Sequence, residues 1–305
     1  MGNEIIINSP QNVYVYNNTF CVESQEVEQT LDFHSELQRL HECNKKDLQL
    51  FFAGVGKNAK AERVKNCGNI LTFKHYRDIG ITKLDNASLC RERLCLNCNR
   101  LLSRDNASVL MQATKGMSLK HIVFSVKNCK GEYLRNTIEN MKKALKYLLR
   151  SKKVKGYYQS YEITYNSRTK EFHPHIHILV ESESISIKAR ELNSSWAKAF
   201  NRFAGTDYKW LSCKCKEVTD NIKGCFELSK YITKPQDFNS ETIPIFDEQL
   251  KGLHLHQSNG IFKERCNNVK KIQEMSQEKE KEYLSNFDYE LMRYIFNGEN
   301  YIKCE

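Results

Sequence analysis

A short segment with three histidines is the clearest candidate in this chain for catalysis or ligand binding. It runs His173-Pro-His-Ile-His-Ile-Leu-Val180, and its polar and apolar residues alternate. Alternation predicts a β-strand with His175 and His177 on one face and the intervening isoleucines on the other. Two imidazoles on one strand face can bind the same divalent metal ion or phosphate group. A half-buried strand without a ligand would show the same alternation, so a second motif is needed.

The second motif follows about fifty residues later, in Phe226-Glu-Leu-Ser-Lys-Tyr-Ile-Thr-Lys-Pro235. A helix that ends at the proline places Glu227, Tyr231 and Lys234 on one face. These groups suit phosphodiester chemistry, because a phenol can attack phosphorus, a carboxylate can accept a proton and an amine can stabilise negative charge. A solvated helix with one surface tyrosine has the same composition. The motif is therefore informative only together with the histidines.

Together, the two motifs resemble the HUH endonuclease superfamily and, within it, the replication initiator (Rep) proteins of small rolling-circle plasmids. The resemblance covers roughly residues 60 to 265 and includes Gly156-Tyr-x-x-x-x-Glu162 and Ser258-Asn-Gly-Ile-Phe-Lys263. It implies a metal-dependent nickase in which Tyr231 becomes joined to a 5′ phosphate and a 3′ hydroxyl is released. Lys234 would orient the phosphate, and Glu227 would activate water or a second nucleophile at termination.

Glu162 is the expected third ligand of the catalytic metal ion. Tyr157 to Tyr165 is predicted to be a strand, joined to the histidine strand by a polar turn at residues 167–170. Facing positions of paired strands lie close together, so Glu162 should lie beside His175 and His177. Two imidazoles and one carboxylate leave positions open for phosphate oxygens and water, which suits Mg²⁺ or Mn²⁺. The alternative is that Glu162 forms an ion pair with a lysine and binds no metal, which the sequence pattern does not exclude.

Four cysteines have the spacing of a zinc site. Cys67 lies upstream of Cys90, Cys95 and Cys98, and the last two form a Cys-x-x-Cys knuckle. Four thiolates satisfy tetrahedral Zn²⁺, which would stabilise a loop-rich stretch with few apolar residues. Unrelated thiols are the alternative.

The charge of the chain points to a polyanionic partner. The 305 residues carry a formal net charge of +10, and residues 1–38 contain six acidic groups but no Lys or Arg. The remaining 47 basic and 31 acidic side chains predict a polyanionic partner for the rest of the protein, and the Rep resemblance implies that this partner is DNA. Twelve cysteines without a secretory signal favour a reducing cytoplasm. No apolar run is long enough to cross a membrane.

The expected fold is α+β. Strands at 119–127, 157–165, the histidine segment and 208–218, with helices from Asn136 or Thr137 to Ser151 and at 185–204, give the order β-α-β-β-α-β. That order predicts a ferredoxin-like, split βαβ domain with an antiparallel sheet. Four segments are predicted: a leader and helical segment (1–60), a Cys-rich zinc module (61–115), an HUH endonuclease catalytic domain (116–240) and a C-terminal extension with a helical tail (241–305).

The leading hypothesis is a plasmid rolling-circle replication initiator that nicks and transfers a single strand of origin DNA. The chain has no Walker-type phosphate loop, so a host helicase must unwind the duplex, and a host polymerase must extend it. Three alternatives remain open at this point. They are an HUH transposase or relaxase, a histidine-triad nucleotide hydrolase suggested by the His-x-His-x-His pattern, and a non-catalytic zinc-dependent DNA-binding regulator.

Overall fold

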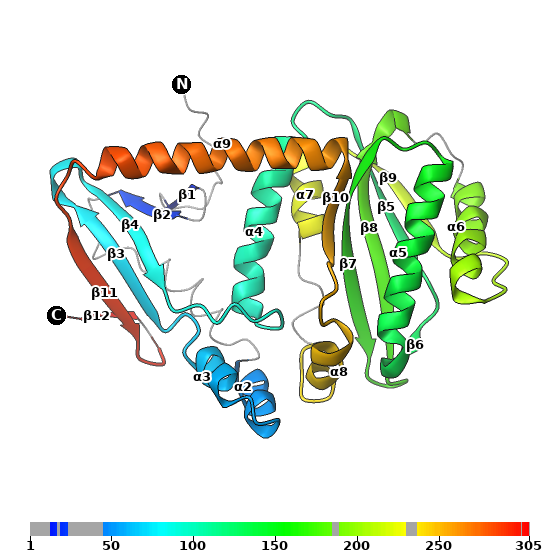
Figure 1. Cartoon of the computed structure of the whole chain (residues 1–305), viewed down its shortest axis with the longest axis horizontal. Coiled ribbons are helices and arrows are strands. Elements are labelled where there is room, and N and C mark those ends of the chain that lie inside the picture. The colour runs from blue at the N-terminus through cyan, green and yellow to red at the C-terminus, as the bar shows by residue number, and fades with distance from the viewer. Residues whose placement is uncertain are drawn as a thin grey trace. The chain divides into compact units, whose positions relative to one another are not determined.

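The computed structural model describes residues 13–16, 19–23, 45–184, 189–229, 237–299 and 301–304. The chain forms two compact units, one of Met1–Leu101 with Ile272–Glu305 and the other of Leu102–Lys271 (Figure 1). The four-segment division expected from the sequence stays a prediction. Among the described helices, none is long and apolar enough to cross a lipid bilayer.

The unit of residues 102–271 is built on an antiparallel sheet with the strand order β10-β7-β8-β5-β9. Its strands are β5 (Leu119–Ser125), β7 (Gly156–Asn166), β8 (Glu171–Glu181), β9 (Cys213–Val218) and β10 (His256–Gly260), and the short β6 (Cys129–Lys130) pairs with β8. Helix α5 (Leu134–Ser151) connects β5 to β7, although β8 lies between these two strands in the sheet. The predicted α+β class with an antiparallel sheet is therefore confirmed.

Helices α5 and α6 (Ala189–Ala204) cover one face of this sheet (Figure 1). Apolar residues recur along α5 every three or four positions, and the buried ones include Ile138, Met141, Leu145, Leu148 and Leu149. From α6, Trp196 packs on Phe124 of β5 with ring centroids 4.9 Å apart, and its indole N–H donates to the carbonyl of Ser125 at 2.9 Å. These contacts place Phe124 of β5 on the face of the sheet that α6 covers.

Helix α5 and strand β9 begin at other residues than the sequence predicts. Helix α5 begins at Leu134, before the expected cap at Asn136 or Thr137, because the 3₁₀ turn Gly131–Tyr133 continues directly into it. Thr137 instead donates its hydroxyl to the carbonyl of Tyr133 at 2.9 Å. Strand β9 begins only at Cys213, because the preceding loop is held by side-chain hydrogen bonds such as that from Asn201 to the carbonyl of Tyr208.

The opposite face of the sheet is partly covered by α4 (Leu96–Ala113), α7 (Asn221–Ser229) and the beginning of α9 (Ile261–Leu284) (Figure 1). Their buried side chains form one apolar cluster around Leu119, Tyr158 and Leu179 of the sheet: Val109, Leu110, Ala113, Cys225, Leu228, Phe262 and Cys266. Leu179 lies two residues after His177, so this cluster borders the part of the face that carries the histidines. Helix α8 (Thr242–Gln249) precedes β10.

Paired glycines attach the edge strand β10 to β7. Gly156 and Gly260 lie opposite each other in the register, and Gly260 has φ +55°, which favours glycine. A Cβ on Gly260 would lie 1.9 Å from the carbonyl oxygen of Lys155, and one on Gly156 would lie 2.7 Å from that of Asn259. The two backbones can therefore approach this closely only without side chains. Both glycines belong to motifs that carry the Rep resemblance.

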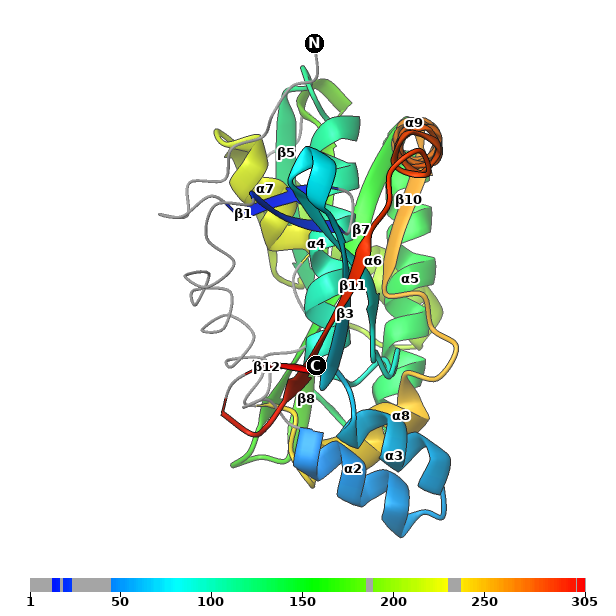
Figure 2. The same cartoon turned by 90° about the vertical axis from the view of Figure 1, so that its left-hand side faces the viewer.

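The unit of residues 1–101 and 272–305 has a second antiparallel sheet, of order β1-β2-β4-β3-β11-β12. Its elements are β1 (Val13–Tyr16), β2 (Thr19–Glu23), α2 (Lys45–Gly54), α3 (Asn58–Lys65), β3 (Ile70–Tyr76), β4 (Ile81–Ala87), β11 (Glu290–Phe296) and β12 (Tyr301–Cys304). Figure 2 shows β3 beside β11, although more than 200 residues separate them in the sequence. Leu71, Phe73, Met292 and Tyr301 form the core of this sheet.

The prediction of a helical C-terminal tail is only partly right. Helix α9 ends at Leu284, and β11 and β12 follow it. The late residues are rich in aromatic and β-branched types, which favour strands, and they pair with β3. The tail therefore completes a sheet that begins in the first quarter of the chain.

Candidate active site

One face of β8 carries the histidines. His173, His175 and His177 are partly exposed, whereas Phe172, Ile176 and Ile178 are completely buried. The predicted alternation is therefore confirmed by the burial of the side chains. Register places Glu162 of β7 opposite His175, so both side chains leave the same face of the sheet.

The two imidazoles and Glu162 form a group of potential metal ligands. His177 Nε2 lies 3.0 Å from Glu162 Oε2, and the ring centroids of His175 and His177 are 6.4 Å apart. The Nδ1 atom of His175 is buried and has no hydrogen-bond partner among the described residues. Two imidazoles, one with an unused nitrogen, and a carboxylate are a donor set that fits a divalent ion. The three groups are less tightly gathered than the cysteines, since within the described ranges only the four thiols come within 4.8 Å of one another.

A third histidine, which is buried, adjoins this group, and the sequence analysis missed it. His121 lies on β5 and is 2% exposed, and its Nε2 is 3.1 Å from Nδ1 of His177. The two rings are stacked, with centroids 5.2 Å apart. In the sequence, His121 stands inside an apolar, β-branched run that predicts a core strand. The only signal in the sequence was a polar residue within an otherwise apolar strand.

Burial makes three histidines of this unit difficult to protonate. Loss of hydration lowers the pKa of His121, His175 and His256 to about 4 each, from an ordinary value of 6.5. Nearby imidazoles add to the effect at His121 and His175. At neutral pH these rings are therefore uncharged and have a lone pair available for a metal ion or a hydrogen bond.

The same pKa shifts predict that acid destabilises the unit of residues 102–271. Between about pH 6.5 and pH 4 the unfolded chain binds protons that the folded chain does not, so the free energy of unfolding falls as the pH falls. Each of these rings contributes at most about 3.5 kcal/mol, since one pKa unit corresponds to about 1.4 kcal/mol. Replacing His256 by Gln should reduce the slope of stability against pH, measured by urea denaturation. The control is His254→Gln, because His254 is exposed and should not affect the slope. An unchanged slope for His256→Gln would contradict the lowered pKa of His256.

Helix α7 brings Glu227 to the same region. Its Cys225 and Leu228 are buried in the apolar cluster, which fixes the helix on the histidine face. The Glu227 carboxylate lies 3.2 Å from Lys216 Nζ of β9, and Lys216 is the register partner of His121. Glu227 and Lys216 also act electrostatically on His121, in opposite directions. The structure therefore places the predicted carboxylate of the tyrosine helix near the imidazoles.

The other two residues of that helix motif, Tyr231 and Lys234, lie outside the described residues. Helix α7 is described to Ser229, and the description resumes at Asp237. The predicted helix to Pro235 and the predicted convergence of Tyr231 with the histidines therefore stay predictions.

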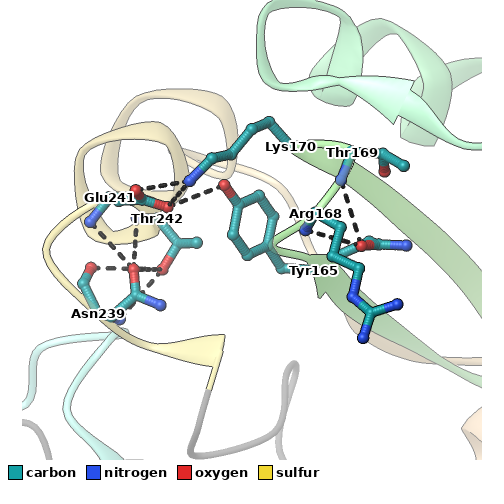
Figure 3. A network of polar contacts seen from close by, with 8 residues as sticks. Tyr165, Arg168, Thr169, Lys170, Asn239, Glu241 and Thr242 are labelled. Atoms are coloured by element: carbon teal, nitrogen blue, oxygen red, sulfur yellow. Dashed lines mark hydrogen bonds and ion pairs between the residues drawn. The ribbon is translucent and has the colours of Figure 1, made fainter.

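The chain after this segment is attached to the β7–β8 hairpin by a network of polar contacts (Figure 3). Lys170 Nζ lies 2.7 Å from one carboxylate oxygen of Glu241, and the Tyr165 hydroxyl donates to the other at 3.1 Å. Asn239 accepts hydrogen bonds from the backbone N–H groups of Glu241 and Thr242 and so forms the turn into α8. The description of the chain therefore resumes, after the segment of Tyr231 and Lys234, at residues that contact the end of the β7–β8 hairpin.

The four predicted cysteines form a compact cluster in the other unit. Cys67 Sγ lies 3.7 Å from that of Cys95 and 3.6 Å from that of Cys98, and Cys90 Sγ lies 3.6 Å from that of Cys98. Backbone N–H groups of Cys90 and Arg91 donate to two of the sulfurs. Hydrogen bonds from the neighbouring thiols, that of Cys90 foremost, lower the pKa of Cys67. This cluster could hold a metal ion.

Comparisons with known proteins give the family. A family model described as "Replication protein" matches residues 81–302. The chain is 28% identical to a Protein rep of Bacillus amyloliquefaciens over 286 residues, which cover 80% of this chain and 84% of the relative. It is 29% identical to a Protein rep of Streptococcus pneumoniae over 224 residues, which cover 67% of this chain and 70% of the relative.

No solved structure is significantly similar. The family match spans both units and includes Cys90, Cys95 and Cys98 as well as Glu162, both histidines and the tyrosine motif. Because it covers well over half of the chain, this protein belongs to the replication protein (Rep) family, the rolling-circle plasmid initiators that its motifs resemble.

Proposed function

We propose that this Rep protein starts plasmid replication by nicking one strand of origin DNA, with Tyr231 as the nucleophile. One observation carries the proposal: Glu162, His175 and His177 share one face of a sheet on which α7 also places Glu227. The chain thus gathers potential metal ligands and a carboxylate on one face, and a tyrosine and a lysine follow that carboxylate four and seven residues later in the sequence. Family membership favours this function over a histidine-triad nucleotide hydrolase.

The strand order supports an HUH endonuclease fold. In sequence order the central strands are β5, β7, β8 and β9, and in the sheet they are arranged β7-β8-β5-β9 with antiparallel neighbours. The connection from β5 through α5 to β7 leaves room for β8 between the two strands, which is the split βαβ arrangement of ferredoxin-like domains. In this arrangement the two central strands β8 and β5 carry His175, His177 and His121.

Glu162, His175 and His177 would hold Mg²⁺ or Mn²⁺, which supplies Lewis-acid polarisation of the scissile phosphate when bound. The Tyr231 hydroxyl oxygen forms a bond to phosphorus while the bond from phosphorus to the 3′ oxygen breaks. The phenol gives up its proton, and the leaving oxygen takes one up as a 3′ hydroxyl. Lys234 stabilises negative charge on the phosphate. A host polymerase then extends the 3′ hydroxyl, and a host helicase separates the strands.

Glu227 would release the enzyme at termination. Its side chain is 41% exposed and forms an ion pair with Lys216, so water or a second DNA hydroxyl can reach it. As a general base, it would accept a proton from the group that attacks the phosphotyrosine. A single tyrosine per chain would then suffice for initiation and termination.

Replacing Glu227 by Ala should leave nicking intact and cause the covalent protein–DNA adduct to accumulate, with release slowed by about 10²- to 10⁴-fold. The measurement is the amount of adduct over time with a labelled origin oligonucleotide. Glu217→Ala is the matched control, because Glu217 is an exposed carboxylate of β9 that is paired with Lys120. Normal release by Glu227→Ala would exclude the assigned role.

The four cysteines would bind structural Zn²⁺. They supply four sulfur ligands, and the backbone N–H groups of Cys90 and Arg91 stabilise negative charge on them. Thiolates select Zn²⁺ over Mg²⁺ and Mn²⁺, so the two proposed sites would bind different metals.

The central test is formation of a covalent adduct. The protein is incubated with a single-stranded oligonucleotide of its plasmid origin and Mn²⁺, and the adduct is mapped by peptide mass spectrometry. An adduct on Tyr231 that forms only with the divalent ion supports the proposal. Attachment to another residue, or specific DNA binding without any nick or adduct, would overturn it.

A further inference from the structure

His121 is a buried histidine for which the nicking mechanism has no role. It lies on β5, the neighbour of the histidine strand, and is 2% exposed. Its Nε2 lies 3.1 Å from Nδ1 of His177, within hydrogen-bond distance, and the two rings are inclined by only 23°. A buried polar side chain in this position requires an explanation, since a core residue of similar size could be apolar.

Both ring nitrogens of His177 are in contact with polar groups. Nδ1 faces His121 and Nε2 faces Glu162 at 3.0 Å. An ionised carboxylate only accepts hydrogen bonds, so the N–H of a neutral His177 ring lies on Nε2. His121 must then donate its own Nε2–H to Nδ1 of His177. These contacts hold the ring at two edges, and rotation about its Cβ–Cγ bond would break both.

The other nitrogen of His121 makes no competing contact. Its Nδ1 atom is buried and has no hydrogen-bond partner among the described residues. Among the described residues, His177 is thus the hydrogen-bond partner of the His121 ring.

We propose that His121 is a positioning residue that holds the His177 ring with Nε2 directed at the metal site. This inference rests on the proposed function, in which His177 is a metal ligand. When the Nε2 lone pair of His177 binds an ion, the ring proton must lie on Nδ1, and His121 can accept it at its own Nε2. Each ring then loses one proton from Nε2 and gains one at Nδ1, so the pair keeps two protons. Histidine suits position 121 because the same nitrogen can donate in one state and accept in the other.

The test is the Mn²⁺ affinity of the full-length protein, measured by electron paramagnetic resonance of the free ion. Mn²⁺ is the appropriate probe because the thiolates of the cysteine cluster have little affinity for it. Replacing His121 by Phe keeps the ring volume but removes both nitrogens, and it should weaken binding by about 10- to 100-fold. His121→Gln should restore most of the affinity, because its amide can donate or accept near the former Nε2 position.

Two further variants make the result specific. His256→Phe removes another imidazole of this sheet, whose Nδ1 atom is also buried, and it should leave Mn²⁺ affinity unchanged. His177→Ala should abolish binding, and unchanged affinity in this variant would overturn both the metal site and the role of His121. Loss of binding in His177→Ala with unchanged affinity in His121→Phe would overturn the positioning role alone. Equal losses of Mn²⁺ affinity in His121→Phe and His121→Gln would also overturn the positioning role.

A second measurement does not depend on metal binding. Long-range ¹H–¹⁵N NMR of the Mn²⁺-free protein reports which nitrogen of His177 is protonated. The Nε2-protonated tautomer should predominate in the wild type and in His121→Gln, whereas His121→Phe should give a mixture of both tautomers. An unchanged tautomer population in His121→Phe would contradict the proposal.

Discussion

Replacement of Tyr231 by Phe is expected to abolish nicking and the covalent adduct while origin binding remains. The substitution removes one oxygen atom, the proposed nucleophile, and leaves the ring and the charge of the protein unchanged. Loss of a covalent nucleophile lowers turnover by several orders of magnitude, to about 10⁶-fold in well-studied hydrolases. Nicking of supercoiled plasmid and adduct formation on an origin oligonucleotide measure the effect, and a gel-shift assay measures binding.

The control for this experiment is Tyr133→Phe. Tyr133 is 57% exposed in the same unit and lies at the beginning of α5, away from the histidine strand in the sequence. It should nick like the wild type. Substantial adduct formation by Tyr231→Phe would show that another group attacks the phosphate, and loss of origin binding would show that Tyr231 also has a structural role.

Replacement of Cys67 by Ser is expected to release the metal of the cysteine cluster and to unfold much of the unit of residues 1–101 and 272–305. Cys67 is fully buried, and its sulfur is within 3.7 Å of those of both Cys95 and Cys98. Metal binding contributes directly to folding, with apparent values of about 10 kcal/mol in isolated zinc modules. We expect Cys67→Ser to lower the free energy of unfolding by more than about 4 kcal/mol. The decrease should be smaller than in isolated zinc modules, because this unit also has its own apolar core.

Zinc content by atomic emission and thermal unfolding by circular dichroism measure this effect. Cys304→Ser is the matched control, because Cys304 belongs to the same unit and lies outside the cluster. Chelation of the wild-type protein should reproduce the instability of Cys67→Ser. Full stability of Cys67→Ser, with no metal bound in the wild type, would show that the thiols are not a structural metal site.

Local patterns were sufficient for much of the fold. Alternation in the histidine segment fixed which face carries His175 and His177, because side-chain direction on a strand depends only on sequence parity. The short polar turn between β7 and β8 fixed the register that places Glu162 opposite His175. The four-cysteine spacing identified a cluster that the fold does bring together. The first two features depend on residues that are close in the sequence. The third depends on cysteine spacing that few kinds of site other than metal sites share.

Other features depend on contacts between distant segments, which no local pattern contains. The tail looked helical in the sequence because α9 is rich in Glu and Lys, but β11 pairs with β3 across more than 200 residues. The pairing of β5 with β8 likewise decided the position of His121, since it brought a residue from an apolar strand into contact with His177.

The amino-acid sequence by itself therefore determined the Rep family, the strand that carries the histidines, and the types of residue available for chemistry. Only the tertiary structure decided that His121 adjoins His177, that α7 presents Glu227 to the same face, and that the last strands complete the first sheet. The physical reason is that these outcomes depend on which apolar surfaces are buried against each other, and burial is a property of the whole folded chain.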